Sequence, residues 1–492
     1  MNLFEPIQRV ALRRGRHPAI IWQDKTLTYA ALLSAIERIA GALHEKGVRA
    51  GDVVAVQAYT LATHVPLALG IARLGAVSLP FTVTGHVWAP EIASMCRARF
   101  LVHGGDDARD FGIRGLAGQF TMEELGRSHA VAPPVADVPG DSPWRIALSS
   151  GTTGRPKAIP CSHESQLLKG AIFRALVASP ADERMLVGMG PAVMFAANFW
   201  LRALLAGRTL VGSEAHPAAM FDAVHRHGVT HFVTSPGNAI AMMDFARSRG
   251  SAALKPAAAM RALVLGGSAV SSAQLQRFKE RLAPNVFVVY GATEVGVVAL
   301  SDTATQEADP GCAGAIPPWV EVQALAQDGS VLPVGKAGRL RMRVPGMASS
   351  YLLPDDDPSS QAFRDGWFHS SDIGCVTPEG TVRLRGRDDD VINLAGVKVD
   401  PADVEAVLAR DAAIVECAVF AIALGAGSPQ LAAAIVAAGE IDGAALRDRC
   451  LREIGPAGAP HFVFRVAALP RNEAGKLVRG QLLDCVRDAQ QI

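Results

Sequence analysis

Apolar side chains recur along the chain in two ways, at helical spacing in some segments and as short continuous runs in others. Residues 28–47 carry apolar positions at helical spacing, begin at a threonine suited to helix capping and end at Gly47. An apolar run at 53–58, a second helical stretch at 63–74 and another run at 76–81 follow. This alternation of helix and strand patterns predicts βαβ units and a largely parallel sheet.

The same alternation resumes after residues 131–143, a connector rich in proline and glycine. A strand is predicted over 144–148. Further along the chain, helices are predicted over 162–178, 197–206, 218–228, 237–249 and 271–282. Strands are predicted between and after them, over 185–189, 208–212, 230–235, 261–266 and 286–290. We therefore expect two sheet subdomains of the βαβ type in the N-terminal part of the chain.

Glycine, proline and aspartate become frequent between residues 312 and 386. They separate short alternating runs such as 339–344 and 381–386, a pattern typical of hairpins or a small distorted barrel. We expect this segment to complete a large N-terminal α/β domain over residues 1–387.

The run Arg387-Asp388-Asp389-Asp390 separates this body from a segment in which helices and strands alternate again. Helices are predicted over 402–410, 443–453 and 478–488, and strands over 413–421, 430–437 and 461–467. The pattern predicts a small, mobile α+β domain over residues 388–492, hinged near Asp389. The alternative for the three aspartates is a solvated acidic turn.

Composition narrows the possible classes of protein. Of the 492 residues 49% are hydrophobic and 19% charged, which allows a large buried interior and excludes a disordered chain. The formal net charge of +1 predicts no nucleic-acid surface. The seven cysteines form no Cys-x-x-Cys pair, so we expect neither a disulfide framework nor a zinc site. With no signal-peptide core and no apolar run of the ~18 residues that span a bilayer, a cytoplasmic protein without stable membrane insertion is expected.

Glycines and hydroxyls are concentrated directly after the predicted strand 144–148, in the run Ser149, Ser150, Gly151, Thr152, Thr153, Gly154, Arg155, Pro156 and Lys157. Glycine lets the backbone approach a ligand closely, hydroxyl and N–H groups can surround phosphate oxygens, and the lysine supplies opposite charge. The spacing is not that of a Walker A loop. The run predicts a polyphosphate-binding loop, the alternative being an ordinary turn at a strand end.

Further candidates follow later strands, where ligands collect in open α/β sheets. In the run 290–294, Tyr290 could stack on a purine, Thr293 could bond a phosphate oxygen and Glu294 could hold Mg²⁺, while Gly291 lies between them. Another strand ends in three residues that would let an adenine lie against bare backbone, namely Gly266, Gly267 and Ser268.

Three charged residues nearer the C-terminus complete the candidate set. Asp372 is a candidate acceptor for two ribose hydroxyls, although an ordinary aspartate turn explains it equally well. Arg387 could pair with ribose or phosphate. Lys476 follows a flexible turn at Gly475, and a lone lysine in such a place is usually a surface residue.

In this order the segments resemble the motifs of the adenylate-forming superfamily, the acyl-CoA synthetases and their relatives. The phosphate loop of that family matches residues 149–157 throughout, and its Tyr-Gly-x-Thr-Glu motif is intact at 290–294. The aspartate of its Thr-Gly-Asp motif is retained at 372 with different neighbours. Its Gly-Arg-x-Asp-Asp motif matches residues 386–390, and the continuation of that motif matches 396–405. Its final Pro-Arg-x-x-x-Gly-Lys motif matches 470–477. The resemblance covers nearly the whole chain.

The resemblance implies a ligase that works in two steps. A carboxylate attacks the α-phosphate of ATP·Mg²⁺ to give an acyl-adenylate and pyrophosphate, and a thiol, commonly that of coenzyme A (CoA), then displaces AMP. Residues 149–157 would hold the β- and γ-phosphates and Glu294 the Mg²⁺. Thr293 and Lys476 would contact the α-phosphate and the carboxylate oxygens.

The resemblance also implies that the C-terminal domain rotates about Asp389 between the two steps. The rotation would remove Lys476 and bring in the loop that carries Gly396 and Lys398. Gly396 would leave room for the pantetheine arm of CoA.

The stretch that forms the acid pocket in the family is mostly apolar here, with the candidate wall residues Phe195, Trp200, Gly266 and Val295. An apolar wall suits a small aliphatic or aromatic carboxylic acid, although each of these residues could equally be core. No acidic residue lies between 185 and 213, which disfavours an amino-acid substrate.

Three functions stay open at this point: an acyl-CoA synthetase, a stand-alone adenylating enzyme that loads an acyl carrier protein, and a nucleotide-binding pseudoenzyme. Retention of the charged motif residues argues against the pseudoenzyme. We expect a monomer or a homodimer.

Overall fold

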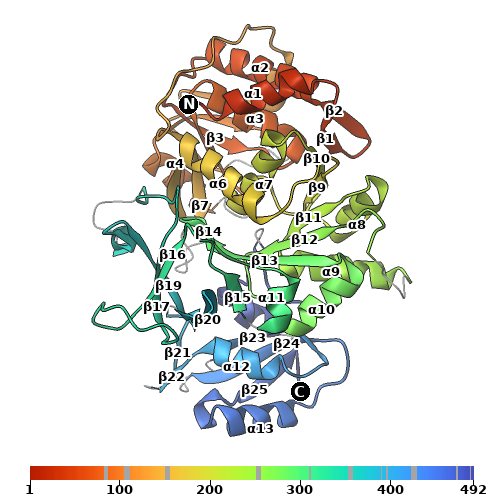
Figure 1. Cartoon of the computed structure of the whole chain (residues 1–492), viewed down its shortest axis with the longest axis vertical. Coiled ribbons are helices and arrows are strands. Elements are labelled where there is room, and N and C mark those ends of the chain that lie inside the picture. Colours follow the sequence, from red (N-terminus) through yellow and green to blue (C-terminus); the bar gives the residue numbers. More distant parts are fainter. Residues whose placement is uncertain are drawn as a thin grey trace.

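The computed structural model describes residues 1–82, 87–104, 111–149, 156–250, 256–309, 312–352, 358–388, 390–394, 397–422, 429–472, 475–487 and 489–492. A large α/β N-terminal domain is followed by a small C-terminal domain, which lies at the bottom of Figure 1 beneath the main body. This is the α/β architecture that the alternation of helix and strand patterns predicts.

One sheet of the N-terminal domain has six strands in the order β6-β5-β3-β4-β7-β8. Its strands are β3 (Val53–Gln57), β4 (Val77–Pro80), β5 (Ala98–His103), β6 (Gly118–Thr121), β7 (Pro143–Ser149) and β8 (Lys157–Ser162). All neighbours are parallel except β7 and β8, which form an antiparallel pair at the edge. The accompanying helices are α2 (Tyr29–Glu45), α3 (Leu61–Arg73), α4 (Ala89–Met95) and α5 (Met122–Arg127).

The second sheet has fourteen strands in the order β16-β17-β19-β20-β15-β14-β13-β12-β11-β9-β10-β1-β2, with β18 beside β19. Its parallel part comprises β1 (Pro18–Trp22), β9 (Arg184–Val187), β10 (Thr209–Gly212), β11 (His231–Thr234), β12 (Ala262–Gly266) and β13 (Asn285–Ala292). The helices of this part are α1 (Phe4–Arg13), α6 (His163–Leu176), α7 (Met194–Leu205), α8 (Pro217–Arg226), α9 (Pro236–Ser248) and α10 (Ser272–Arg281).

The sheet continues in antiparallel fashion beyond β13. These strands are β14 (Gly296–Ser301), β15 (Cys312–Ala315), β16 (Glu321–Leu325), β17 (Gly338–Arg343), β18 (Phe363–Arg364), β19 (Trp367–Val376) and β20 (Thr381–Arg387), with β2 (Lys25–Thr28) antiparallel to β1 at the other end. Helix α11 (Thr303–Ala308) follows β14. The strands enclose an apolar cluster that includes Val298, Leu340 and Met342. This region is the one predicted as hairpins or a small distorted barrel.

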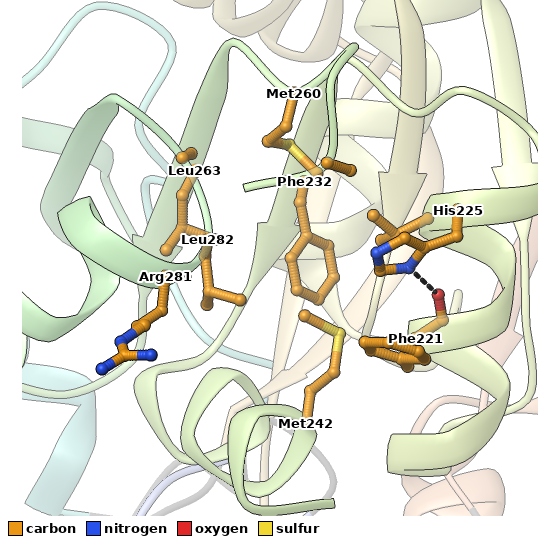
Figure 2. Close-up of a pocket in the computed structure, with 11 residues that line it drawn as sticks. Phe221, His225, Phe232, Met242, Met260, Leu263, Arg281 and Leu282 are labelled. Atoms are coloured by element: carbon orange, nitrogen blue, oxygen red, sulfur yellow. Dashed lines mark hydrogen bonds between the residues drawn. The ribbon is translucent and has the colours of Figure 1, made fainter. Parts of the chain in front are cut away.

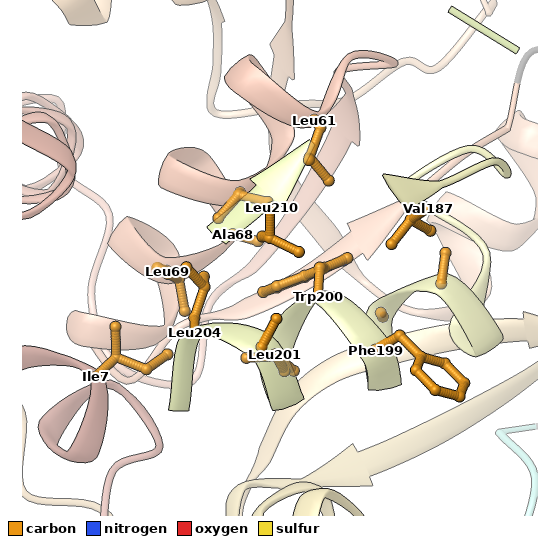
Figure 3. Packing of buried hydrophobic residues seen from close by; sticks show 14 of the residues in the cluster. Ile7, Leu61, Ala68, Leu69, Val187, Phe199, Trp200, Leu201, Leu204 and Leu210 are labelled. Atoms are coloured by element: carbon orange, nitrogen blue, oxygen red, sulfur yellow. The ribbon is translucent and has the colours of Figure 1, made fainter. Parts of the chain in front are cut away.

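Trp200 stands at the centre of the largest apolar cluster, between α7 and the neighbouring elements (Figure 3). Its side chain is fully buried among residues that include Leu61 and Leu210, and its indole N–H donates to the Pro191 carbonyl at 3.4 Å. Trp200 therefore packs in the core, and its place in the wall of the acid pocket stays a prediction, because the sequence pattern cannot tell a core tryptophan from a pocket wall.

The C-terminal domain has a four-stranded sheet of β23 (Ile414–Ile422), β24 (Gln430–Ala437), β25 (Phe462–Arg465) and β26 (Gln490–Gln491), preceded by the hairpin β21 (Ile392–Leu394)–β22 (Val397–Val399). Its helices are α12 (Pro401–Leu408), α13 (Gly443–Glu453) and α14 (Leu482–Val486). Asp400 caps α12 by accepting from the Ala402 N–H at 2.9 Å. The predicted helix 478–488 is shorter, because a 3₁₀ turn over Arg479–Gln481 precedes α14.

Among the described residues, no helix combines the length and the apolar character that crossing a bilayer requires. A small apolar pocket between α8, α9 and strand β11 is lined by residues that include Phe221, Phe232 and Met242 (Figure 2). None of the candidate site residues lines it, so the chemistry must be sought elsewhere.

Candidate active site

The two ends of the predicted phosphate loop are fixed in a strand pair. Ser149, the last residue of β7, lies directly opposite Lys157, the first residue of β8, in the antiparallel ladder. Ser150, Gly151, Thr152, Thr153 and Gly154 lie outside the described residues. The loop therefore joins the two strands of a hairpin, and Lys157 stands at its base.

Glu294 lies with Thr293 in the tight turn between β13 and β14. A Cβ atom on Gly291 would come within 1.9 Å of the carbonyl oxygen of Gly296, so only glycine permits this turn. The Glu294 side chain is 8% exposed and accepts a 2.9 Å hydrogen bond from the phenol hydroxyl of Tyr351. A largely buried carboxylate is thereby held by a neutral donor on Oε1.

Asp372 is held from two sides. It lies opposite Arg387 in the β19–β20 ladder, and the Arg387 Nη1 is 3.2 Å from its Oδ1. The Tyr290 hydroxyl donates to its Oδ2 at 2.7 Å. Burial, followed by the Asp372 charge, raises the pKa of Tyr290 well above its usual value, so the phenol stays a donor at neutral pH. Tyr290, Asp372 and Arg387, three of the residues predicted to contact adenine and ribose, thus form one group.

Phe195, in the first turn of α7, covers the end of β12. A Cβ atom on Gly266 would lie 2.6 Å from the Phe195 ring, so the ring rests directly on glycine backbone. Gly267 follows in a left-handed conformation with φ of +100°, and Ser268 comes next. Val295 is fully buried in the apolar cluster of the antiparallel strands, and its place in the acid pocket stays a prediction.

The segment that carries Lys476 is docked on the beginning of α9. A Cβ atom on Gly475, whose φ is +72°, would come within 1.9 Å of the Ser235 Oγ. Arg471 donates to the Gly475 carbonyl at 2.7 Å and forms an ion pair with Glu416. Its side chain also packs on Gly237, where an added Cβ atom would come within 2.6 Å of the Arg471 Cδ. The C-terminal domain therefore meets the N-terminal domain through a close steric fit.

The Lys476 ammonium lies within electrostatic reach of two acidic groups of the N-terminal domain. Surrounding protein lowers the pKa of Lys476, while the Glu294 carboxylate raises it, Arg387 lowers it and Asp372 raises it. The side chain nevertheless keeps much of its surface in water. Both observations fit a cation that stands between two domains, close to protein on several sides and still reachable by a ligand.

Two residues near Glu294 escaped the sequence analysis. One is Tyr351. The other is Lys169 on α6, whose side chain is 4% exposed and whose Cε lies 3.3 Å from the Cβ position of Gly296. Burial lowers the pKa of Lys169, and the charges of Cys161 and Glu294 oppose that shift. No motif or spacing signals either residue, because only the packing of separate elements brings Tyr351 and Lys169 close to Glu294.

The residues predicted for the thiol step are described only in part. Asp389 and Gly396 lie outside the described residues. Lys398 lies in β22, opposite Asn393 in the β21–β22 ladder. Their roles stay predictions.

Comparison with known proteins shows the family of the chain. The family model for the AMP-binding enzymes matches residues 7–352, about 70% of the chain, and that for the AMP-binding enzyme C-terminal domain matches residues 403–476. The chain belongs to the AMP-binding enzyme family. The expected domain boundary after Arg387 falls between the two matches, which leaves it a prediction.

Several relatives of this AMP-binding enzyme span most of its length. It is 28% identical to a fatty acid–[acyl-carrier-protein] ligase of Streptomyces coeruleorubidus, over 95% of this chain and 93% of the relative. It is 27% identical to a long-chain-fatty-acid–CoA ligase of Mycobacterium tuberculosis, over 93% of this chain and 92% of the relative. The solved structure of o-succinylbenzoate CoA synthetase from Bacillus subtilis with its acyl-adenylate superposes with a TM-score of 0.84 at 21% identity, covering 99% of this chain and 98% of that one.

Proposed function

We propose that this enzyme activates a small carboxylic acid with ATP to an acyl-adenylate and then transfers the acyl group to the thiol of CoA. The observation that carries the proposal is the position of Lys476. A cation from the C-terminal domain lies within electrostatic reach of Glu294, which follows the end of β13, and of Asp372 in β19. The names of the relatives, acid ligases that use CoA or a carrier protein, support the same chemistry.

The residues present suit ATP with Mg²⁺. Proteins usually hold Mg²⁺ through one or two carboxylates together with substrate phosphates, and the buried Glu294 offers such a carboxylate. The described part of the chain contains no group of three or more potential protein ligands that would form a complete metal cage. We infer that Glu294 holds Mg²⁺, which neutralises charge on the phosphates.

Each residue of the site then has a distinct task in adenylation. Asp372 and Arg387 bind the ribose, and the ring of Tyr290 stacks on the adenine. Lys157 holds the departing pyrophosphate at the base of the loop. Lys476, together with Thr293, stabilises the charge that develops between the α-phosphate and the attacking carboxylate, which is the main catalytic demand of such a transfer.

The acid is expected to lie beside Phe195, where the ring rests on the Gly266 backbone. An aromatic wall suits an aliphatic or aromatic carboxylic acid. The fatty-acid ligases among the relatives support this class.

The acceptor thiol is the less constrained half of the proposal. One relative named above uses a carrier protein, which makes a carrier protein the alternative to CoA. In either case the domain boundary after Arg387 is expected to act as a hinge at Asp389. Rotation there would withdraw Lys476 and bring the loop with Gly396 and Lys398 to the adenylate.

Pyrophosphate release over a panel of carboxylic acids, with CoA, with a phosphopantetheinylated carrier protein and with neither, tests the proposal. We expect acid-dependent pyrophosphate formation and a thioester with CoA. Thioester formation with the carrier protein alone would favour the alternative. Tight ATP binding without pyrophosphate from any acid would instead indicate a pseudoenzyme.

The hinge has its own test in the substitution Asp389→Pro. A proline fixes φ and should oppose rotation. We expect ATP–pyrophosphate exchange to be retained and CoA ester formation to be lost. Equal loss of both reactions would contradict the hinge.

A further inference from the structure

Tyr351 is the residue that touches both charged groups of the proposed pyrophosphate site. Its hydroxyl donates to Glu294 Oε1 at 2.9 Å. The Lys157 Nζ lies 5.1 Å from the centroid of its ring. One side chain therefore contacts the proposed Mg²⁺ ligand with its polar end and the proposed phosphate-binding lysine with its face.

The backbone around Tyr351 joins the two sheets that carry these groups. The Ala348 N–H donates to the Glu294 carbonyl at 2.8 Å, and the Leu352 N–H donates to the Ala158 carbonyl at 2.8 Å. Glu294 follows β13 of the fourteen-stranded sheet, whereas Ala158 belongs to β8 of the six-stranded sheet. Residues 348–352 thus cross between the sheets at the place where the phosphate loop begins.

The side chain is itself well fixed. Its ring packs edge-on against Phe363, with centroids 5.1 Å apart. A carboxylate can only accept, so the phenol must be the donor to Glu294. Burial, followed by the Glu294 charge, raises the pKa of Tyr351, which keeps the phenol protonated over the neutral range.

We propose that Tyr351 is a positioning residue that sets the geometry of Glu294 and Lys157 for the Mg²⁺-bound pyrophosphate group of ATP. The inference rests on the proposed function. The hydroxyl fixes Oε1 of the Glu294 carboxylate, which would hold the cation, and the ring keeps the flexible lysine side chain in one place. The two tasks belong to separate parts of the side chain, so substitutions can separate them.

Tyr351→Phe removes the hydroxyl and keeps the ring. The Glu294 carboxylate loses its hydrogen-bonded neutral partner, and we expect the Mg²⁺ concentration for half-maximal ATP binding to rise about tenfold, the usual effect of losing a hydrogen bond to a charged group. Pyrophosphate affinity at saturating Mg²⁺ should change less than about twofold, because the ring still supports Lys157.

Tyr351→Leu removes both contacts. It should show the same Mg²⁺ effect and, in addition, weaken pyrophosphate binding at saturating Mg²⁺ by about threefold to tenfold, as expected for a lost cation–ring contact. The phenylalanine variant is therefore the matched control: it retains the ring contact with Lys157 and loses the hydrogen bond to Glu294. Thermal unfolding of both variants shows whether the fold is intact, and the phenylalanine variant suffices if the leucine variant does not fold.

Calorimetric titration with ATP, and with pyrophosphate, at several Mg²⁺ concentrations measures these effects without turnover. An unchanged Mg²⁺ requirement in Tyr351→Phe, or equal pyrophosphate affinity in the two variants, would overturn the inference. Failure of the proposed function is a different result: the wild-type protein would bind ATP but release no pyrophosphate with any acid.

Discussion

The phenol hydroxyl of Tyr290 and the carboxylate of Asp372 are hydrogen-bonded at 2.7 Å, although 82 residues separate them in sequence. Their strands, β13 and β19, are four places apart in the sheet order, with β14, β15 and β20 between them. Four strand spacings in a flat sheet would span about 19 Å. The antiparallel end of the sheet must therefore curl back on β13, which is how the distorted barrel brings the proposed adenine and ribose contacts together.

Tyr290→Phe tests this relationship. Asp372 loses the donor on Oδ2 and keeps Arg387, so its orientation toward the ribose becomes less defined. We expect the KM for ATP in ATP–pyrophosphate exchange to rise about tenfold, which corresponds to ~1.4 kcal/mol. The control is Tyr29→Phe, which removes a buried hydroxyl that donates to the Arg208 carbonyl at 2.7 Å. Neither Tyr29 nor Arg208 belongs to the candidate site. An equal KM in the wild type and Tyr290→Phe would contradict the proposed ribose site.

Lys476→Ala should separate the two half-reactions. Removing one electrostatic donor from a transition state typically lowers the rate by ~10²–10³-fold. We expect that loss in acyl-adenylate formation, while thioester formation from preformed acyl-adenylate stays close to that of the wild type. Single-turnover assays of each half-reaction measure the two rates. Lys336→Ala, at an exposed turn, is the control that should change neither. Parallel loss of both half-reactions would argue against this division.

Gly475→Ala should disturb adenylation through the docking of the C-terminal domain. The new methyl group would meet the Ser235 Oγ at 1.9 Å, and φ of +72° is strained for alanine. We expect adenylation to fall at least tenfold while thioester formation from the adenylate is less affected. Gly480→Ala, where nothing lies within 4 Å of the new atom, is the matched control in the same segment. Similar behaviour of the two variants would contradict the steric fit at Ser235.

His64 should make the protein less stable in weak acid. It is buried, faces an Arg145 Nη1 at 3.4 Å, and has a pKa lowered from 6.5 to about 3, first by burial and then by Arg145. Below pH 6.5 His64 is protonated in the unfolded chain but not in the folded protein. The free energy of unfolding therefore falls as the pH is lowered from 6.5 to about 3. We expect a loss of about 2 kcal/mol between pH 6.5 and pH 5 from this residue.

Urea unfolding at several pH values measures that loss. His64→Gln should flatten the pH dependence in this window, whereas His129→Gln, at an exposed position, should leave it unchanged. The buried His163, with a pKa lowered by burial to about 4, contributes in the same direction and keeps part of the slope. An unaltered slope in His64→Gln would show that His64 is not buried in its neutral form.

Much of the fold follows from apolar periodicity and capping residues. The observed α2 and α13 lie within two residues of the predicted helices 28–47 and 443–453, and β24 coincides with the predicted strand 430–437. Strand β8 was missed, because Pro160 lies within it. Proline removes a ladder donor, yet β8 is an edge strand of its sheet, where that loss is tolerated.

The site was predictable only as far as its residues form contiguous motifs. Tyr290, Glu294 and Asp372 could be identified from such motifs. Tyr351 and Lys169 could not, because each acts through a contact that only the packing of separate elements creates. Apolar residues are harder still: Trp200 and Phe195 lie on the same helix, and only the structure shows that Trp200 is fully buried while the Phe195 ring rests on the Gly266 backbone.

The C-terminal domain encloses its apolar clusters with its own residues, from Ile392 onward in the described part of the chain. It meets the main body through steric fit, through Val415, which packs against an apolar cluster of the N-terminal domain, and through polar contacts such as the 3.1 Å bond from Gln274 to the Val415 carbonyl. A unit of this kind can be exchanged between related ligases as a block without rebuilding either core. Grafting it onto a different acid-binding body would then transfer Lys476 while leaving the choice of acid with the recipient.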